Sequence, residues 1–442
     1  MRTVLCLLLI LVIPCVALAQ QKTREQKVRE DRAKVQADGF WLYNDLPAAF
    51  AQARSSGKPI LVVLRCIPCE ECVKLDDELM DNDPVLRPLM EQFVCARQVS
   101  TNGLDLSLFQ FDTDQSFAVF LLNADGTIYG RFGTRSHRTE WYGDVSIEGL
   151  AKALEKALEL HAEYPASKSL VAGKRGKPLE VASPEQYPSL RDRYTDTLNV
   201  TGDVVKSCIH CHQIGDGQRD WYRARGEPIP TKILFPYPHP KVVGLTLDPH
   251  ELSRVAAVEP DSAAANAGLQ AGDEIEQMDS QVLLSIADFQ WALHNIDPAG
   301  ARVPLVVRRG EKQLELTLPL EDGWREAGDL SWRVSSWGLR RMATGGLQLE
   351  PLPDEERGRL KIADDAMALR VKHVGQWGAH ATAKKAGFQQ GDVIVEFDGR
   401  DDLMTDTELL VHGVTHRKPG EQVDVVVLRD GSRRELKLPM QQ

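Results

Sequence analysis

The C-terminal half of the chain contains an internal repeat, and this repeat limits the fold more than any other feature. The segment AGLQAGDEI at 267–275 recurs as AGFQQGDVI at 386–394. Each copy continues into two alternating apolar stretches joined by a short turn, Arg309-Gly310 in the first and Asp430-Gly431 in the second. Self-similarity of this kind indicates that one domain is present twice.

The rest of the chain must form further domains. A length of 442 residues exceeds what one hydrophobic core usually supports, so we expect three or four domains. The formal net charge of −11 repels phosphate backbones and anionic lipid. Nucleic acids and membrane surfaces are therefore excluded as general partners.

The N-terminus has the pattern of an export signal. Arg2 precedes an apolar run from Val4 to Val16, and Ala17-Leu18-Ala19 follows as a small-residue cleavage site. We expect a signal peptide at 1–19 and export to the periplasm or cell envelope. An uncleaved anchor is the alternative, but the run is short for a membrane span. The charged stretch after it, up to Asp38, is predicted to be a tether or an exposed helix.

Residues 39–164 read as one compact α/β domain. A β-branched strand from Pro59 to Leu64 precedes a second strand around Phe93 to Val99. A hairpin from Phe117 to Phe132 and an amphipathic helix from Ile147 to Glu163 complete the unit. The following segment, 165–189, is rich in Lys, Gly, Ser and Pro and is predicted to be a linker.

The most specific chemical motif lies in the segment 190–240. Cys208-Ile209-His210-Cys211-His212 has the C-x-x-C-H spacing at which two thiols attach to one porphyrin and the next imidazole reaches the iron. We therefore expect one covalent c-type haem on Cys208 and Cys211, with His212 as the axial iron ligand. A second redox dithiol, or half of a zinc site, is the alternative.

The second axial ligand is restricted by the absence of methionine between Met90 and Met278. His239 lies in the proline-stiffened loop 236–240 and is the candidate we favour. Met278 is better read as a core residue of a strand. Arginines 219, 223 and 225 could pair with haem propionates, although such residues more often serve packing.

Three cysteines follow the first strand of the α/β domain. Cys66, Cys69 and Cys72 lie just before a helical pattern, and a helix N-terminus lowers a thiol pKa, as thiol-disulfide exchange requires. From Lys58 through this cluster to Leu75 the sequence resembles thioredoxin-like domains, and the resemblance extends to about Tyr164. It implies that Cys69 is the nucleophile, Cys72 the resolving thiol and Cys66 an additional thiol.

One departure from the thioredoxin-like pattern matters. The family carries a cis-proline opposite its dithiol, whereas this chain has no proline between Pro88 and Pro165. Metal binding by the three cysteines, or a structural disulfide, therefore remains open beside the redox function.

Both repeats resemble PDZ domains, over about 241–320 and 345–439. The family adds an extended peptide to a sheet edge and holds its C-terminal carboxylate on backbone amides of a Gly-Leu loop. By resemblance this loop is Val243-Gly244-Leu245 in the first copy and Gly346-Leu347 in the second. The second copy inserts 352–365 after its loop, which predicts an occluded groove. Alternatively, one or both copies serve only as spacers or clamps.

The sequence thus predicts a multi-domain α/β and mainly-β chain that is similar to exported thioredoxin-like/PDZ proteins of bacteria such as planctomycetes. The expected function is electron transfer or thiol-disulfide exchange by haem and dithiol. Partners would be a redox donor or acceptor and the peptide C-termini or extended segments that the PDZ domains recruit. The alternative is a PDZ binding scaffold whose thioredoxin-like domain is non-catalytic or binds metal. No protease-like Ser, His and Asp arrangement accompanies the repeats.

Overall fold

The computed structural model describes residues 22–65, 83–115, 117–134 and 145–442. The predicted signal peptide lies outside these residues, and so do Cys66, Cys69 and Cys72. Among the described residues, no helix is long and apolar enough to cross a membrane.

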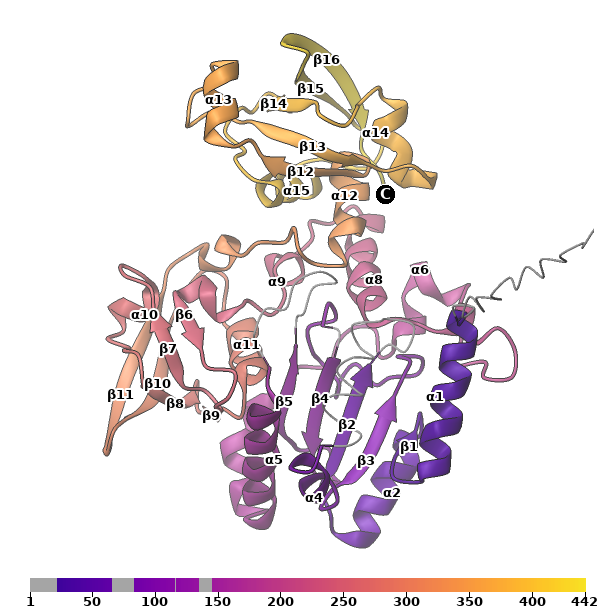
Figure 1. Cartoon of the computed structure of the whole chain (residues 1–442), viewed down its shortest axis with the longest axis vertical. Coiled ribbons are helices and arrows are strands. Elements are labelled where there is room, and N and C mark those ends of the chain that lie inside the picture. Colours follow the sequence, from indigo (N-terminus) through magenta and orange to yellow (C-terminus); the bar gives the residue numbers. More distant parts are fainter. Residues whose placement is uncertain (1–21, 66–82, 116, 135–144) are drawn as a thin grey trace, which may run out of the picture.

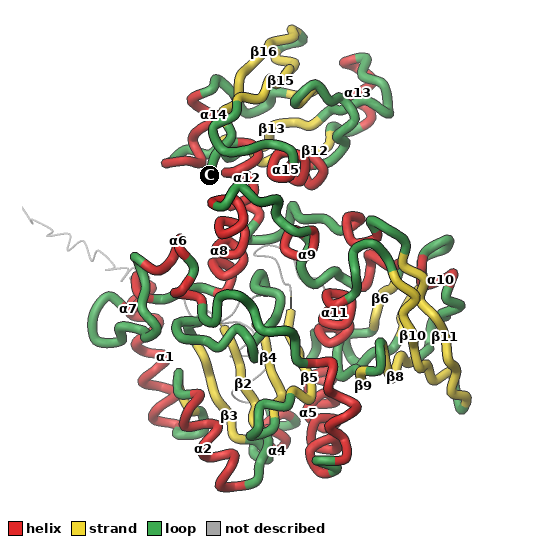
Figure 2. The backbone as a smooth tube through the Cα atoms, turned by 180° about the vertical axis from the view of Figure 1, so that it is seen from behind, coloured by secondary structure: helices red, strands yellow, loops and turns green. Residues whose placement is uncertain are grey.

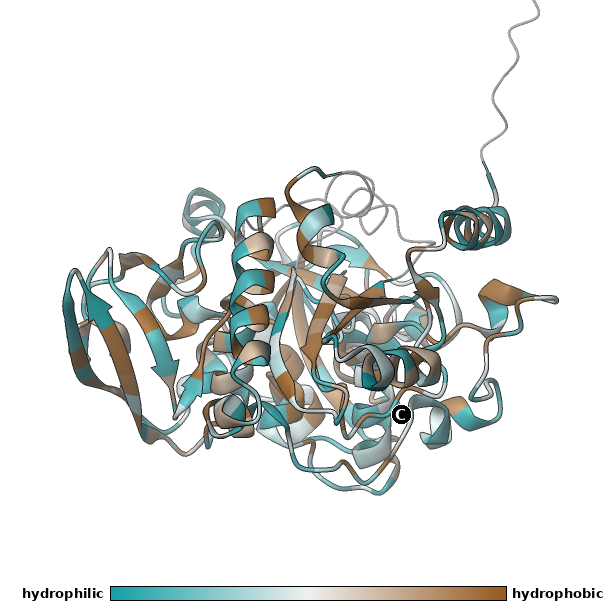
Figure 3. Cartoon of the chain, turned by 90° about the horizontal axis from the view of Figure 1, so that it is seen from below, coloured by the Kyte–Doolittle hydropathy of each residue, from teal (hydrophilic) through white to brown (hydrophobic). Residues whose placement is uncertain are grey.

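The N-terminal α/β domain is built on a five-stranded sheet of order β1-β3-β2-β4-β5. Strand β2 pairs in parallel with β3 and antiparallel with β4, which forms the predicted hairpin with β5. Figure 1 shows helices on both sides of this sheet, and Figure 3 shows its strands as strongly hydrophobic. The elements of this domain are β1 (Leu42–Tyr43), α2 (Leu46–Ser56), β2 (Ile60–Arg65), α4 (Leu86–Met90), β3 (Val94–Gln98), β4 (Phe117–Leu122), β5 (Ile128–Thr134) and α5 (Ile147–Ala162).

The charged stretch after the signal forms helix α1 (Arg24–Asp38), which a capping box at Thr23 begins. Its Val28 and Val35 are buried, and its Asp31 lies 2.6 Å from the guanidinium of Arg65. The helix is therefore docked on the α/β domain rather than free.

The segment 165–189 connects the domains but is packed along most of its length. It contains the 3₁₀ helices η2 (Ala166–Lys174) and η3 (Pro184–Gln186), and Val171 and Val181 are buried in two different core clusters. Its Gly, Ser and Pro content predicts a flexible linker, but the apolar residues among them provide anchors that hold it to the protein.

The segment 190–240 forms a bridge between the α/β domain and the second repeat. Helix α8 lies between the sheet of the α/β domain and α12, and the views in Figures 1 and 2 agree on this. The elements are α6 (Pro188–Arg191), α7 (Val204–Ser207), α8 (Cys211–Ala224) and α9 (Thr231–Leu234), with η4 (Pro240–Val243) leading into the first repeat.

The first repeat consists of the pair β6-β7, a four-stranded sheet of order β11-β10-β8-β9 and two helices. Met278 ends β8 and is fully buried, which confirms that it is a core residue of a strand. The elements are β6 (Leu245–Leu247), β7 (Val255–Val258), α10 (Ala263–Asn266), β8 (Glu274–Met278), β9 (Gln281–Val282), α11 (Ile286–Asn295), β10 (Ala301–Arg309) and β11 (Lys312–Leu320).

The second repeat has a five-stranded sheet of order β12-β13-β14-β15-β16. It is preceded by η5 (Trp324–Ala327) and α12 (Ser336–Thr344). Its elements are β12 (Leu347–Pro351), α13 (Asp354–Leu360), β13 (Leu369–Val374), η6 (Gly378–Ala381), α14 (Thr382–Lys385), β14 (Val393–Phe397), α15 (Asp406–Thr415), β15 (Gln422–Arg429) and β16 (Ser432–Pro439).

Buried ion pairs fix the domains to one another. Lys174 Nζ lies 2.5 Å from Asp288 Oδ2 of α11, and both side chains are almost fully buried. In the connector before α12, Arg333 donates to Asp112 and Asp114 of the α/β domain at 2.8 and 3.0 Å. Pairs of this kind have little freedom to move because a buried charge that loses its partner is strongly unfavourable.

Candidate functional site

The C-x-x-C-H motif is held against the carboxyl edge of the sheet in the α/β domain. The Thr101 backbone N–H and hydroxyl both donate to the Ile209 carbonyl, at 3.1 and 2.9 Å. The Asn102 side chain accepts from the Ile209 N–H and donates to the Ser207 carbonyl. Thr101 and Asn102 therefore position the motif, although the sequence alone gives no signal for this role beyond their place after a strand.

This docking brings the motif close to the point where the chain enters the cysteine cluster. Arg65, the last residue before Cys66, and Cys211 line the same small cavity, of about 10 Å³. In the sequence, the C-x-x-C-H motif and the cluster of Cys66, Cys69 and Cys72 are predicted as separate sites. In the structure, Arg65, which precedes that cluster, lies at the same cavity as Cys211.

The two thiols of the motif are free, with Cys208 buried and Cys211 partly exposed. Burial raises the pKa of Cys208 to about 11, against a hydrogen bond with Ser100 that lowers it. Burial and the neighbouring Cys208 raise the pKa of Cys211 to about 12. Both groups are therefore thiols rather than thiolates at neutral pH.

The two histidines of the motif differ in environment. Burial and then the nearby His212 lower the pKa of His210 to about 4, so its imidazole is neutral. His212 lies in the first turn of α8 with about a third of its side chain exposed, and its Nδ1 is 3.7 Å from Asp216. An acidic partner on one ring nitrogen leaves the other free to bind a metal ion. The two rings lie parallel, with their centres 5.9 Å apart.

The donor set of this segment fits a c-type haem, because Cys208, Cys211 and His212 could supply two thioethers and one axial imidazole. The space beside the thiols is closed in the described conformation, where Cys208 is 6% exposed. The part of the chain that the structure describes contains no group of three or more His, Cys, Asp or Glu that could hold a metal ion.

The residues suggested for haem contacts have other partners. Arg219 donates to the Ser335 carbonyl, and Arg223 donates to carbonyls of Arg417 and Gln441 at the end of the second repeat. Arg225 pairs with Glu180 and Glu227. Arg223 therefore holds the end of the second repeat and Arg219 the connector before it, which are packing roles. Pairing of these arginines with haem propionates stays a prediction.

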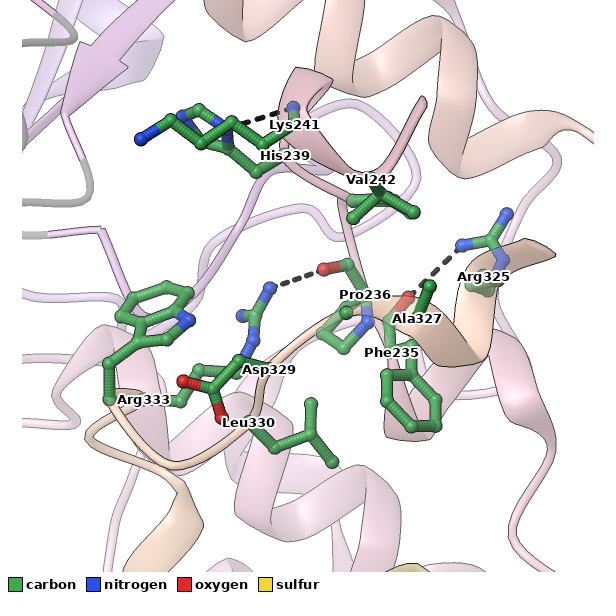
Figure 4. A pocket seen from close by; sticks show the side chains of 13 residues that line it. Phe235, Pro236, His239, Lys241, Val242, Arg325, Ala327, Asp329, Leu330 and Arg333 are labelled. Carbon is green, nitrogen blue, oxygen red and sulfur yellow. Dashed lines mark hydrogen bonds between the residues drawn. The ribbon is translucent and has the colours of Figure 1, made fainter. Parts of the chain in front are cut away.

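His239 lies at a pocket that the sequence did not indicate. In Figure 4 its ring faces the backbone of Lys241, whose N–H donates to His239 Nδ1 at 3.2 Å. The cavity, of about 290 Å³, is bounded by the proline-rich loop 235–242 and the connector 325–333. The described surroundings of His239 are thus those of this pocket, and its role as an iron ligand stays a prediction.

The predicted loop Val243-Gly244-Leu245 turns at a glycine, whose own N–H donates to the Lys241 carbonyl at 3.0 Å. Gly244 has a φ of 79°, and a Cβ there would lie 2.1 Å from Ser262 Cβ, so only glycine fits. Its carbonyl accepts from the Glu259 N–H, towards β7. Because successive residues of a strand alternate direction, Leu245 and Leu247 turn their backbone groups away from β7. No described strand pairs with that edge.

The corresponding edge of the second repeat is covered. Gly346 has a φ of 95°, and its carbonyl accepts from the Gly375 N–H, towards β13. Leu347 faces the opposite way, and its carbonyl accepts from the Thr344 hydroxyl of α12 at 3.1 Å. The two predicted loops therefore have similar backbone conformations, but α12 packs against the strand that follows the second loop.

Family comparisons match the chain in three places. A thioredoxin-like model matches residues 41–124, and two PDZ models match 254–309 and 374–440. The chain carries a thioredoxin-like domain and two PDZ domains. This confirms the predicted fold class, in which the first repeat is the first PDZ domain and the second repeat is the second.

Curated relatives are similar to part of the chain. A probable periplasmic serine endoprotease DegP-like of Hahella chejuensis is 27% identical over 181 residues, which are 40% of this chain and 36% of that protein. The periplasmic pH-dependent serine endoprotease DegQ of Escherichia coli is 30% identical over 149 residues, 34% of this chain and 29% of that protein. The chain spans about a third of the length of these relatives. Among solved structures, the HtrA-type protease AlgW with decapeptide is 19% identical, with a TM-score of 0.21 over 34% of this chain and 43% of that chain.

Proposed function

We propose that the chain is an exported scaffold whose first PDZ domain binds the C-terminal segment of a partner polypeptide. The observation that carries this proposal is the unpaired edge of β6, where the backbone groups of Leu245 and Leu247 face outward beside a loop that requires Gly244. A peptide strand can pair with such an edge through main-chain hydrogen bonds, which provide affinity without a fixed sequence.

The charge beside the loop favours a carboxylate. Lys241 is exposed and lies three residues before Gly244 at the rim of the cavity in Figure 4. An ammonium group at this position attracts the negative end of a peptide, with an effect that salt screens.

The rest of the chain keeps this groove rigid. Helix α11, which shares a core with Leu245 and Leu247, is bound on its other side to β5 of the thioredoxin-like domain. The Arg131 N–H donates to Asp288 Oδ1 at 2.9 Å, and Lys174 pairs with the other carboxylate oxygen. A groove held in one shape loses less conformational entropy on binding.

The experiment is an array of random C-terminal heptapeptides, each synthesised with a free carboxylate and as an amide, and probed with the full chain. We expect binding to the free acids and not to the amides. Lys241→Glu should weaken that binding about tenfold or more at low salt, because a local attraction becomes a repulsion. Lys312→Glu, an exposed change on β11, is the matched control. Equal binding of acids and amides would refute the proposal.

A second proposal retains the covalent haem on Cys208 and Cys211 with His212 as axial ligand. Two observations support it: the start of α8 at Cys211 and the approach of Asp216 to His212 Nδ1. When bound, the group would supply one-electron chemistry, while the chain orients the imidazole through Asp216. The Cys208 thiol must leave its buried position for attachment.

The test is expression in a host that exports the chain and attaches haem. Haem should remain with the denatured polypeptide, and Cys208→Ser with Cys211→Ser should abolish this. Haem that is extracted by acid acetone would exclude attachment. His239→Ala should turn a low-spin spectrum high-spin if His239 is the second ligand, whereas an unchanged spectrum would exclude it.

A further inference from the structure

Helix α12 lies against the second PDZ domain where the first has an unpaired edge. It packs against both β12 and α15, the two elements that border this groove. Its apolar side forms part of a buried cluster, to which α12 and α15 contribute Leu339, Met342, Ala343, Leu410 and Val414. The helix is thus an integral part of the domain's surface and not a free connector.

One backbone group on the outward side of β12 is occupied by this arrangement. Residues 346 and 352 bond towards β13, so Leu347 and Leu349 face away from it. The Leu347 carbonyl accepts from Thr344 of α12. Asp406, the first residue of α15, is buried, which raises the pKa of its carboxyl, while Arg340 and the Leu349 backbone act to lower that pKa.

A buried ion pair connects α12 to that same carboxylate. Arg340 Nη2 donates to Asp406 Oδ2 at 2.7 Å, and both side chains are more than nine-tenths buried. The Arg340 guanidinium also donates to the Ser331 carbonyl and the Ser336 hydroxyl, so α12 and its preceding loop are held as one unit. An incoming peptide strand would have to displace this pair from the edge of β12.

A glycine within α15 marks the close contact of the two helices. Glycine is less favourable than alanine inside a helix, yet Gly413 occupies this position. A Cβ at Gly413 would lie 2.7 Å from Ala343 Cβ, closer than side chains can approach. Gly413 therefore allows α12 to pack closely against α15.

The first PDZ domain lacks both features. Ser285 and Thr405 are the N-caps of α11 and α15, so Ile286 stands where the second domain has Asp406, and Leu293 where it has Gly413. Ile286 and Leu293 belong to the first domain's own core. The two PDZ domains therefore differ at corresponding positions of α11 and α15.

We propose that α12 is a built-in occupant of the second PDZ groove, which makes this domain an internal clamp rather than a peptide receptor. The inserted segment 352–365, expected to occlude the groove, instead packs its Leu352 with Ala368 and Val393. We therefore infer that α12 covers the second groove, whereas the sequence predicts that the inserted segment covers it. This inference does not depend on peptide binding by the first domain.

The test is hydrogen exchange of the full chain, resolved for peptides covering 336–344 and 347–351. Both should be protected in the wild type. Asp406→Asn should accelerate their exchange about a hundredfold, because Arg340 is left buried without its partner. Asp402→Asn, which removes an exposed carboxylate on the same domain, should change neither. Protection of β14 to β16 in each variant shows that the domain remains folded.

Gly413→Ala provides an independent test that changes no charge. With α12 in the groove, the added methyl group should displace the helix and raise exchange at 336–344. If α12 is not seated there, alanine should raise the melting temperature through its better helix propensity and leave exchange unchanged. That second result, or unprotected 336–344 in the wild type, would overturn the proposal.

Discussion

The ion pair between the thioredoxin-like domain and the connector gives the sharpest stability prediction. Arg333 is 4% exposed and donates to Asp112, Asp114 and the Pro236 carbonyl. Arg333→Met leaves two buried carboxylates without their cation. Breaking a buried pair in this way costs about 3–5 kcal/mol, or about a hundredfold to a few thousandfold in the opening equilibrium.

The measurement is native-state hydrogen exchange at the connector, where the Ser335 N–H donates to Asp114 at 2.8 Å. Exchange here reports opening between domains and does not require two-state unfolding of a multi-domain chain. The triple variant R333M/D112N/D114N should regain most of the protection, because no uncompensated charge remains. A change below about threefold in R333M, or a triple variant worse than R333M, would refute the reasoning.

Further predictions concern the reactivity of the Cys208 and Cys211 thiols, the stability of the connector at low pH and the contact between β5 and the first PDZ domain. At pH 8, iodoacetamide should label Cys208 and Cys211 of the haem-free chain about a hundredfold more slowly than an exposed thiol, because their pKa values are near 11 and 12; labelling at the exposed rate would contradict their burial. Burial raises the pKa of Asp114, but Arg333, Arg219 and Ser335 together bring it below its usual value, so its stabilisation is present above about pH 4 and is lost as the pH falls through the lowered pKa. The acid-induced rise in exchange at the connector should therefore be smaller in Asp114→Asn. Gly130→Ala should raise the hydrogen exchange of β5 by an amount that corresponds to about 1–3 kcal/mol, because a Cβ would lie 2.7 Å from Leu284 Cδ2, while Gly358→Ala, with open space around it, should not destabilise.

The sequence predicts the local elements well, for a physical reason. The hairpin of β4 and β5 depends on two apolar runs and the turn between them, all within a few residues, and the repeated AGxxxGD segment indicates two copies of one domain. The core role of Met278 follows from its place in a strand.

The contacts between domains could not be predicted in the same way. Lys174 belongs to a segment with the composition of a linker, and its partner Asp288 is 114 residues away. Arg340 and Arg223 look like surface cations until the fold buries them against Asp406 and the end of the second PDZ domain. Composition reports what a residue prefers on average, whereas these side chains are buried because a specific partner compensates their charge. The roles of Cys66, Cys69 and Cys72 stay predictions, since they lie outside the described residues.

The central claim is that the chain offers one open peptide groove on a rigid scaffold. Isothermal titration of the full chain with a free-acid heptapeptide selected on the array tests it most directly. The account predicts one peptide per chain, lost in Lys241→Glu at low salt and unchanged in Lys312→Glu. Two peptides per chain, or binding that Lys241→Glu leaves unchanged, would contradict it.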